Sequence, residues 1–442
     1  MELDLLIAEI GSTTTLVNGF RGINTGKVEF VGQGLAPTSV LDGDVMIGLQ
    51  KAIDNLKEKL GIDNLNWQEF MATSSAAGGL KMTVHGLVKD MTVKAAREAA
   101  LGAGAVIKMV TAGRLREFQL EEILKIKPNI ILLAGGVDYG EEETIIFNAR
   151  RLSELDLKVP VIYAGNRVLQ REISHIFQET GKEILITDNV YPAIDTLNIK
   201  PTRKLIHEVF ARHIVKAPGM QRIEEMLSTD MMPTPGAVME AARFLKEEIG
   251  NLLVIDVGGA TTDVHSVTED SATVHEILIN PEPEAKRTVE GDLGVFLNAS
   301  RVYNLLKEEL AIERRDDLSP LPRDEKEAEY IELLAEKAAL TAVERHAGRI
   351  KDYYGPGGRK TIAEGKDLTA VRWVIGTGGA LTRLRRGREI LEKVKGNGKR
   401  TLLPPEEARV LIDNDYIMAS LGLMSRRCPE AALELLKRSL GL

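Results

Sequence analysis

The chain has 442 residues, of which 44% are hydrophobic and 28% charged, so it can bury one large two-lobed core or two to three domains. Its 57 Lys and Arg against 65 Asp and Glu give a formal net charge of −8, which argues against a nucleic-acid-binding surface. The single cysteine excludes an intrachain disulfide, no apolar run reaches the ~20 residues of a membrane span, and the N-terminal residues lack a signal peptide's basic segment. We therefore expect a cytoplasmic protein with no membrane partner.

In chain order, the first half predicts hairpin-like strands and then an alternation of helices and strands. Strands are expected at 3–10, 14–20, 27–34 and 69–73, with an amphipathic helix at 45–60. Further on, helices are expected at 92–106, 120–125, 142–154 and 167–180, and buried strands at 129–133, 159–163 and 183–186. This alternation predicts a parallel, doubly wound sheet, which we interpret as an α/β subdomain inserted at about 92–201.

The second half predicts a connector and a further lobe rich in helices. Prolines and glycines between 216 and 236 interrupt regular structure, and a helix at 237–248 follows them. Strands are expected at 251–257 and 261–268, and helices at 294–310, 324–345, 406–411, 413–423 and 431–440. The predicted domains are a first lobe, 1–245, that contains the insertion, and a second lobe, 246–442.

The most informative features are two loops of similar composition, one in each half of the chain. In each loop an apolar run and one carboxylate, Glu9 or Asp256, precede glycine and small hydroxylated residues, and a third glycine-rich segment occupies 374–381. Glycine lets the backbone approach a ligand closely, and backbone N–H groups and hydroxyls can donate to phosphate oxygens. The candidate nucleotide-binding residues are Gly11, Ser12, Thr13, Thr14, Gly258, Gly259, Thr261, Thr262, Gly376, Thr377, Gly378 and Gly379.

Three carboxylates accompany these loops. Glu9 and Asp256 stand where they could hold Mg²⁺, largely through its waters, because that ion keeps much of its hydration. Asp263 could bind the metal or orient the attacking water. We therefore predict Glu9, Asp256 and Asp263 as catalytic residues, with Glu9 and Asp256 as metal ligands. A plain glycine turn could explain one loop, but it does not explain the ordered set of three.

These residues resemble the actin-like ATPase superfamily, in which two ribonuclease-H-like lobes clamp ATP between two phosphate loops and an adenosine loop. The second loop, 256–263, and the adenosine loop, 376–379, match that pattern, whereas Glu9 replaces the usual aspartate of the first loop. The resemblance implies ATP and Mg²⁺ as cofactors. It also implies an α/β fold of two actin-like (ribonuclease-H-like) lobes, with the additional α/β subdomain in the first half.

A narrower resemblance covers nearly the whole chain. The segments 73–82, 132–138, 161–166, 258–266 and 286–294 are similar to the glutamate mutase accessory family called MutL or GlmL, which shares only a name with the mismatch-repair protein. That family implies a chaperone-like reactivase, a slow Mg²⁺-dependent ATPase whose partner is an adenosylcobalamin-dependent mutase or aminomutase. The resemblance leaves open which mutase is the client, whether a second subunit is needed and whether the protein forms a homo-oligomer.

Two other functions stay open at this point. A small-molecule kinase of the same superfamily would need a general base, for which Asp138 and Asp188 are candidates, and a filament-forming nucleotide binder would need none. The segment around His265 resembles a cobalt-ligating motif, but a core histidine in a strand is the favoured interpretation because Thr268 replaces the motif's glycine. The basic run 383–388 is better interpreted as a solvated helix start than as a nucleotide contact.

Overall fold

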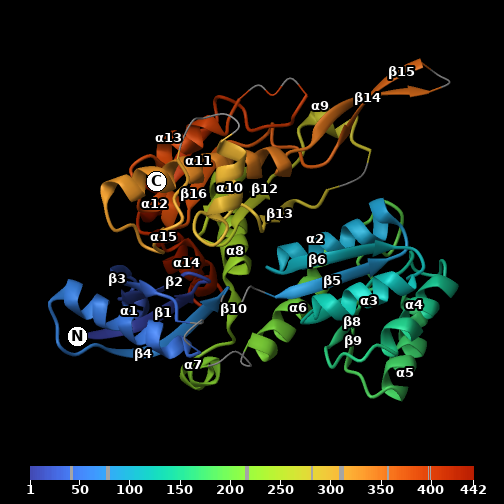
Figure 1. The fold of residues 1–442 in the computed structure, drawn as a ribbon, viewed down its shortest axis with the longest axis horizontal. Helices are drawn as coiled ribbons and strands as arrows, with labels where there is room; N and C mark the ends of the chain where they lie inside the picture. The colour runs from blue at the N-terminus through green and yellow to red at the C-terminus, as the bar shows by residue number, and fades with distance from the viewer. Residues whose placement is uncertain are drawn as a thin grey trace. The chain divides into compact units, whose positions relative to one another are not determined.

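The computed structural model describes residues 1–39, 43–75, 80–214, 219–279, 282–307, 313–355, 358–396, 398 and 400–442. It contains two compact units: unit 1 comprises Met1–Ala77 and Val215–Leu442, and unit 2 comprises Gly78–Ile214 (Figure 1). Residues 76–79 of the family-like segment 73–82 and residues 216–218 of the connector lie outside the described residues. Unit 2 extends beyond the expected subdomain, 92–201, at both ends. The strand at Lys81–Gly86 and the helix at Ile199–Ile214 pack with the rest of this unit.

The first sheet of unit 1 has the strand order β10-β4-β1-β2-β3. Strands β1, β2 and β3 are antiparallel, whereas β4 and β10 run parallel to β1. Helix α1 (Val45–Leu60) packs on β2 and β3, begins at the capping carboxylate of Asp44 and ends at left-handed Gly61. The strands are β1 (Glu2–Ile10), β2 (Thr14–Arg21), β3 (Glu29–Pro37), β4 (Asn66–Ser74) and β10 (Met232–Pro233).

The second sheet of unit 1 repeats this topology. Its order is β13-β12-β11-β16-β17, again with three antiparallel strands followed by two strands parallel to the central one. The strands are β11 (Leu252–Val257), β12 (Thr262–Val267), β13 (Ala285–Glu290), β16 (Trp373–Thr377) and β17 (Arg409–Ile412). Two sheets of one ribonuclease-H-like topology confirm the predicted fold class. The predicted helix at 406–411 is wrong, because Arg409–Ile412 pairs with β16 as an edge strand.

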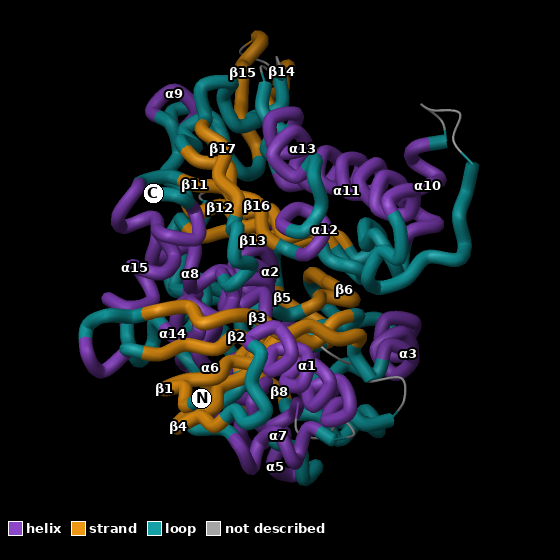
Figure 2. The backbone as a smooth tube through the Cα atoms, turned by 90° about the vertical axis from the view of Figure 1, so that its left-hand side faces the viewer, coloured by secondary structure: helices purple, strands orange, loops and turns teal. Residues whose placement is uncertain are grey.

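A single apolar core joins the two sheets of unit 1. Side chains of β1 and β4 and side chains of β11, β12 and β16 contribute to one cluster with helices α8 (Thr234–Ile249), α14 (Met418–Met424) and α15 (Pro429–Leu440). Figure 2 traces the backbone of these strands and helices. The other face of the second sheet packs against α10 (Ala299–Leu306), α11 (Glu325–His346) and α13 (Gly387–Lys393). The predicted lobe boundary at 245/246 falls within α8, which contacts strands of both sheets.

Unit 2 is a parallel, doubly wound sheet, as predicted. Its order is β6-β5-β7-β8-β9, and helices α3, α4 and α5 pack against it through one apolar cluster. Its elements are β5 (Lys81–Gly86), a π-helical turn (Lys89–Val93), α2 (Lys94–Gly102), β6 (Val106–Ala112), α3 (Glu117–Ile126), β7 (Ile130–Leu133), α4 (Glu143–Ser153), β8 (Val161–Tyr163), α5 (Gln170–Glu179), β9 (Ile184–Ile186) and α6 (Ile199–Ile214).

Other elements also differ from the sequence-based expectation. β5 was not predicted, and the expected helix at 92–106 ends early because Val106–Ala112 pairs with β5 as an edge strand. The connector contains a helix, α7 (Met220–Met226), and Pro233 and Pro235 lie at the start of α8, where a missing N–H is tolerated. The hairpin of β14 (Arg349–Gly355) and β15 (Gly358–Glu364) also went unpredicted. No described helix is long and apolar enough to cross a membrane.

Close packing of α14 on α8 generates a stability prediction. A Cβ at Gly422 would lie 1.9 Å from the carbonyl oxygen of Ala237, so Gly422→Ala should force the helices apart and lower the free energy of unfolding by about 1–3 kcal/mol. In the control Gly102→Ala, a helical glycine with only the flexible Arg203 side chain nearby, stability should be unchanged or slightly higher. Urea unfolding of both variants tests this, and equal effects would contradict it.

Candidate nucleotide-binding site

The two glycine loops of unit 1 have the same backbone geometry. In the first loop the N–H of Gly11 donates to the carbonyl of Thr14 at 2.9 Å, and in the second the N–H of Gly258 donates to the carbonyl of Thr261 at 3.0 Å. A Cβ at Gly11 would lie 2.5 Å from the Thr14 oxygen, so the first turn requires glycine. Each loop thus connects the first two antiparallel strands of its sheet in the same way, as the sequence pattern predicted.

The two loops face each other directly. A Cβ built on Gly259 would lie 2.7 Å from Oγ1 and 3.1 Å from Cβ of Thr13, so the second loop approaches the first to within van der Waals contact. The turn after β13 supports the second loop from behind: the N–H groups of Phe296 and Leu297 donate to the carbonyl of Gly259 at 2.9 and 2.8 Å. This turn follows directly on the segment 286–294, which carried part of the family resemblance.

The third loop lies against the carboxylate of the second. Gly378 has a φ of 85°, and a Cβ there would meet Asp256 Oδ1 at 2.4 Å and the backbone nitrogen of Val257 at 2.8 Å. Gly378 precedes the short helix α12 (Gly379–Thr382), and Gly376 packs against Leu391 within the core. The three segments predicted from the sequence therefore come together in one region of unit 1.

Several of the predicted hydroxyl donors already have partners in the protein. The hydroxyls of Ser12, Thr262 and Thr377 donate to the carbonyls of Ser75 and Leu293 and to the carboxylate of Asp413, at 2.8, 2.7 and 3.0 Å. Their bonds hold the loops in shape. Thr13 lies where the two loops meet, and Thr14 begins β2, so the loop backbone and Thr13 are the donors best placed for a ligand between them.

Glu9 is buried where the first sheet meets α14. Its Oε1 accepts hydrogen bonds from the backbone N–H and hydroxyl of Ser420, at 3.1 and 2.6 Å, and from Nδ2 of Asn18 at 3.2 Å. Burial raises the pKa of Glu9 to about 8; the Ser420 bonds oppose this shift, and the nearby charges of Asp413 and Asp256 add to it. Glu9 is therefore tied to the second lobe through α14.

Asp256 and Asp413 complete a group of three neighbouring carboxylates. The pKa of Asp256 is raised to about 7, mainly by burial and also by the charges of Asp263 and Asp413, while the charge of Arg287 opposes the shift. Asp413 accepts the N–H groups of Ile417 and Met418 at 3.2 and 2.9 Å, which fixes the start of α14. Within the described residues, no group of three or more His, Cys, Asp or Glu side chains is arranged to hold a metal ion directly.

Asp263, which was predicted to bind the metal or orient the attacking water, lies in a buried ion pair. Its Oδ1 accepts Nε of Arg287 at 2.8 Å and also the Arg287 Nη2, and its Oδ2 accepts the hydroxyl of Thr261 at 3.2 Å. Both partners of this ion pair are buried. Asp263 thus binds the guanidinium group of Arg287 beside the second loop. The sequence analysis did not identify Arg287 as a residue of the site.

A polar network missed by the sequence analysis connects the two lobes of unit 1. Gln33 Nε2 donates to Asn18 Oδ1 at 2.8 Å and to the carbonyl of Tyr416 at 3.0 Å, and its Oε1 accepts the guanidinium of Arg383. Arg383, in the basic run interpreted as a solvated helix start, thus reaches from the end of α12 to β3. Asp413 could have been identified from the sequence, because it follows an apolar run as Asp256 does. It was missed because that run was predicted to be helical.

Two other residues considered in the sequence analysis, His265 and Asp138, have structural roles. His265 is fully buried in β12, and burial followed by the charge of Arg287 holds its pKa well below the usual value, in keeping with a core histidine. Asp138, the candidate base of a kinase, accepts the N–H of Arg167 and the amide of Asn189, both at 2.9 Å, and so joins loops within unit 2.

Comparison with known proteins identifies the family. A family model described as MutL protein matches residues 5–440. The chain belongs to the MutL family. Protein MutL of Clostridium tetanomorphum is 37% identical over an alignment 463 positions long, which covers 98% of each chain. The resemblance to the glutamate mutase accessory family is therefore confirmed along the whole chain.

Solved structures are more distant. A nucleotide-free acetone carboxylase aligns with 95% of this chain and 70% of its own, at 12% identity and a TM-score of 0.39. A nucleotide-free diol dehydratase-reactivating factor aligns with 96% of this chain and all of its own, at 12% identity and a TM-score of 0.37. At these TM-scores the likeness assigns neither fold nor function to this MutL family member.

The contact between Gly378 and Asp256 generates a prediction about the site. Gly378→Ala should cost about 1–2 kcal/mol for its left-handed backbone and a further 1–3 kcal/mol for the clash with Asp256 and Val257. The control Gly61→Ala, with a φ of 64° but open space, should show the first cost alone. Chemical denaturation measures both variants, and a Gly378→Ala protein as stable as Gly61→Ala would overturn the close contact.

The carboxylate cluster predicts a pH dependence in protein free of nucleotide and metal. Because the folded-state pKa values of Glu9 and Asp256 lie above their ordinary values, the folded state binds more protons than the unfolded state, and stability should fall as the pH rises from about 5 to about 8. Glu9→Gln should flatten this decline, whereas Glu58→Gln, at an exposed site on α1, should not. Thermal unfolding across this range provides the measurement, and an unchanged slope in Glu9→Gln would contradict the assignment.

Proposed function

We propose that this protein is an ATP-dependent accessory protein that reactivates an adenosylcobalamin-dependent mutase or aminomutase. The observation that carries the nucleotide part of the proposal is the mutual contact of three glycine loops beside buried carboxylates. Thr13 meets Gly259, and Gly378 meets Asp256, so one ligand between the loops would touch both lobes of unit 1. The family assignment supports the accessory role.

The residues present fit Mg²⁺ and a nucleotide phosphate chain. Glu9 and Asp256 carry raised pKa values because they are buried near further negative charge, and a divalent cation would stabilise their ionised forms. Their arrangement suits contacts through metal-bound waters, which Mg²⁺ retains readily. When bound, the ion would neutralise phosphate charge. The N–H groups of residues 12–13 and 259–260 would donate to the phosphate oxygens, since those of Gly11 and Gly258 already close their own turns.

In this proposal Asp256, Asp263 and the buried Arg287 have different roles in hydrolysis. Asp256, with a pKa near neutrality, accepts a proton from or orients the attacking water. Arg287 holds the carboxylate of Asp263 in a fixed position beside the second loop. Catalysis would come from positioning and electrostatic stabilisation, because both loops are held by backbone hydrogen bonds before the ligand arrives.

Coupling of hydrolysis to a partner follows from the contacts between the lobes. Glu9 with Ser420, and Gln33 with Arg383, join the first sheet to α14 and α12, next to the loops. Loss of the γ-phosphate would alter the contacts of both loops, and the two lobes would then favour a different separation. The ATP-bound and ADP-bound forms would then bind the mutase with different affinities, and this difference would allow damaged cobalamin to leave the mutase.

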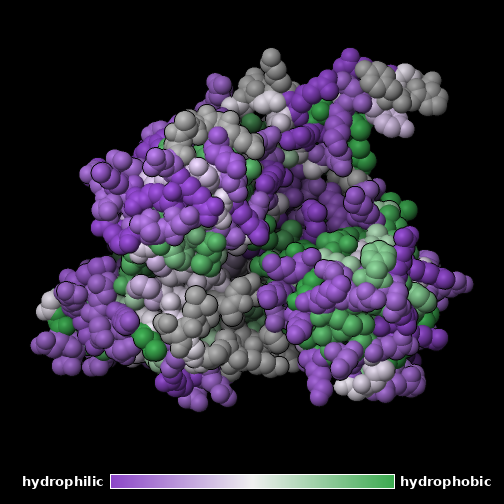
Figure 3. Space-filling view, viewed as in Figure 1, coloured by the Kyte–Doolittle hydropathy of each residue, from purple (hydrophilic) through white to green (hydrophobic). Residues whose placement is uncertain are grey.

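Unit 2, with the connector at 216–236, is the proposed client-facing surface. Although it holds under a third of the chain, unit 2 carries more than half of the large apolar side chains that are exposed among the described residues, and green areas mark apolar surface there (Figure 3). Clustered exposed apolar area is typical of protein-interaction surfaces. These side chains belong to Val88, Val110, Phe118, Leu124, Tyr139, Phe147, Val168 and Ile194.

A reconstitution assay tests the proposal. A mutase inactivated with a non-reactive cobalamin is incubated with this protein, ATP, Mg²⁺ and fresh adenosylcobalamin, and mutase activity is followed. Recovery should require ATP, and Asp256→Ala should slow ATP hydrolysis about 10²–10³-fold and prevent recovery, because a positioned charge is lost at the reacting phosphate. Asp63→Ala, at an exposed turn residue, should behave as the unaltered protein.

Two outcomes separate the parts of the proposal. Recovery of activity without nucleotide would refute the ATP-dependent reactivase, whereas unchanged hydrolysis in folded Asp256→Ala would refute only the role of that residue. ATP consumption that depends on a metabolite and yields its phosphorylated product would establish the kinase alternative instead.

A further inference from the structure

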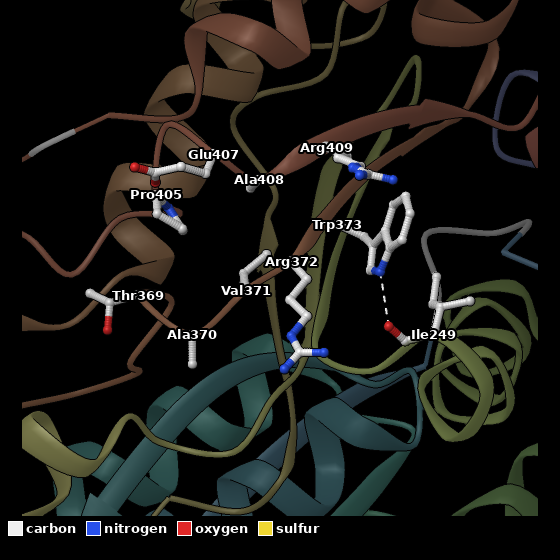
Figure 4. A pocket seen from close by; sticks show the side chains of 10 residues that line it. All are labelled: Ile249, Thr369, Ala370, Val371, Arg372, Trp373, Pro405, Glu407, Ala408 and Arg409. Carbon is white, nitrogen blue, oxygen red and sulfur yellow. Dashed lines mark hydrogen bonds between the residues drawn. The ribbon is translucent and has the colours of Figure 1, made fainter.

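A pocket of about 450 Å³ opens at the edge of the second sheet of unit 1 (Figure 4). It is lined by the segment that leads into β16, the segment that leads into β17, and the last residue of α8, Ile249. The volume lies within the range of small-molecule sites, about 300–1,000 Å³. None of the functions proposed above uses this pocket.

The pocket lies at the opposite end of the strands from the glycine loops. β16 runs from Trp373 at the pocket to Thr377 beside the adenosine loop, and β17 runs from Arg409 at the pocket toward Asp413. Because parallel strands rise about 3.3 Å per residue, the five residues of β16 place about 13 Å between the pocket and the nucleotide site. The pocket is therefore a separate site on the same strands.

An aromatic ring with a fixed orientation forms part of the wall. The indole N–H of Trp373 donates to the carbonyl of Ile249 at 2.9 Å, and the guanidinium carbon of Arg409 lies 5.5 Å from the centre of the ring system (Figure 4). These contacts fix the ring on two sides. Ala370, Val371 and Ala408 add further apolar lining. Such a wall favours a ligand that has a flat or apolar part.

The charged side chains of the pocket carry a net positive charge. Arg372 and Arg409 oppose one acid, Glu407. Among the described residues, neither arginine forms an ion pair, and Arg372 makes no side-chain hydrogen bond, although its guanidinium lies close to Gly250. In a chain of net charge −8, two such guanidinium groups at one pocket are available to an anion.

We propose that this pocket binds a small anionic ligand, a carboxylate or phosphate attached to a flat apolar group. Arg372 supplies the charge-assisted hydrogen bonds to the anion, and Trp373, held by Arg409 and Ile249, contacts the apolar part. The inference does not depend on ATP hydrolysis, since no residue of the glycine loops takes part. Carboxylate and phosphate share the required chemistry, and the experiment distinguishes them.

Trp373 itself can report on the site, because the chain has only two tryptophans. Trp67, on β4, packs against Phe70 and can be replaced by phenylalanine, which leaves Trp373 as the single indole. Benzoate and phenyl phosphate are titrated into Trp67→Phe protein in the absence of nucleotide, and the emission of Trp373 is followed. Benzyl alcohol provides the uncharged control, and inorganic phosphate provides the anion without a ring.

We expect a saturable change in emission with benzoate, phenyl phosphate or both, and none with benzyl alcohol or inorganic phosphate. Adding Arg372→Gln should weaken binding about tenfold or more, because a charge-assisted hydrogen bond is lost, whereas adding Arg438→Gln, on the exposed face of α15, should leave it unchanged. No saturable response to either aromatic anion, equal binding of benzyl alcohol or inorganic phosphate, or undiminished binding in a folded Arg372→Gln protein would overturn the proposal.

Discussion

The proximity of like charges where the two lobes of unit 1 meet is the constraint on which the candidate site depends. Glu9 comes from the first sheet, Asp256 from the second, and Asp413 from the strand end that leads into α14. Burial of such a group is unfavourable unless protons or a cation compensate it. Hydrogen bonds from Ser420 and Asn18 nevertheless hold Glu9 in this position, and a backbone N–H at the start of α14 holds Asp413. The fold thus maintains a region that favours binding of positive charge.

The duplicated topology explains how two distant segments reach this region. Each sheet begins with a hairpin whose turn contains a glycine and an i to i+3 backbone bond, at Gly11 in one sheet and at Gly258 in the other. A shared core with α8 and α14 sets the sheets so that Thr13 and Gly259 touch. Since α14 also supplies Ser420, its close packing on α8 at Gly422 supports both the core and the position of Glu9.

The second sheet presents different chemistry at its two ends. At the carboxyl ends of β11 and β16 the glycine loops expose backbone donors beside Asp256, whereas at the amino ends Trp373 and the two arginines line an open pocket. The parallel strands β11, β16 and β17 have all their carboxyl ends at one edge of the sheet and all their amino ends at the other. One site can therefore lie at each edge without overlap. A short, rigid connection through β16 and β17 joins them.

By itself the sequence determined the glycine loops, the family and most of the helices and strands, because these depend on local patterns. The turn at Gly258 and the third glycine loop at Gly378 could be located because glycine directly after a short apolar run indicates the end of a buried strand. Only the tertiary structure decided which partners the polar groups take. It paired Asp263 with Arg287, tied Glu9 to Ser420, and made a strand of Arg409–Ile412, whose four apolar-rich residues suit a helix or a strand until a neighbour offers backbone hydrogen bonds. Contacts between residues hundreds of positions apart leave no periodic signal in the chain, and so the electrostatics of the site and the pocket at Trp373 came from the fold alone.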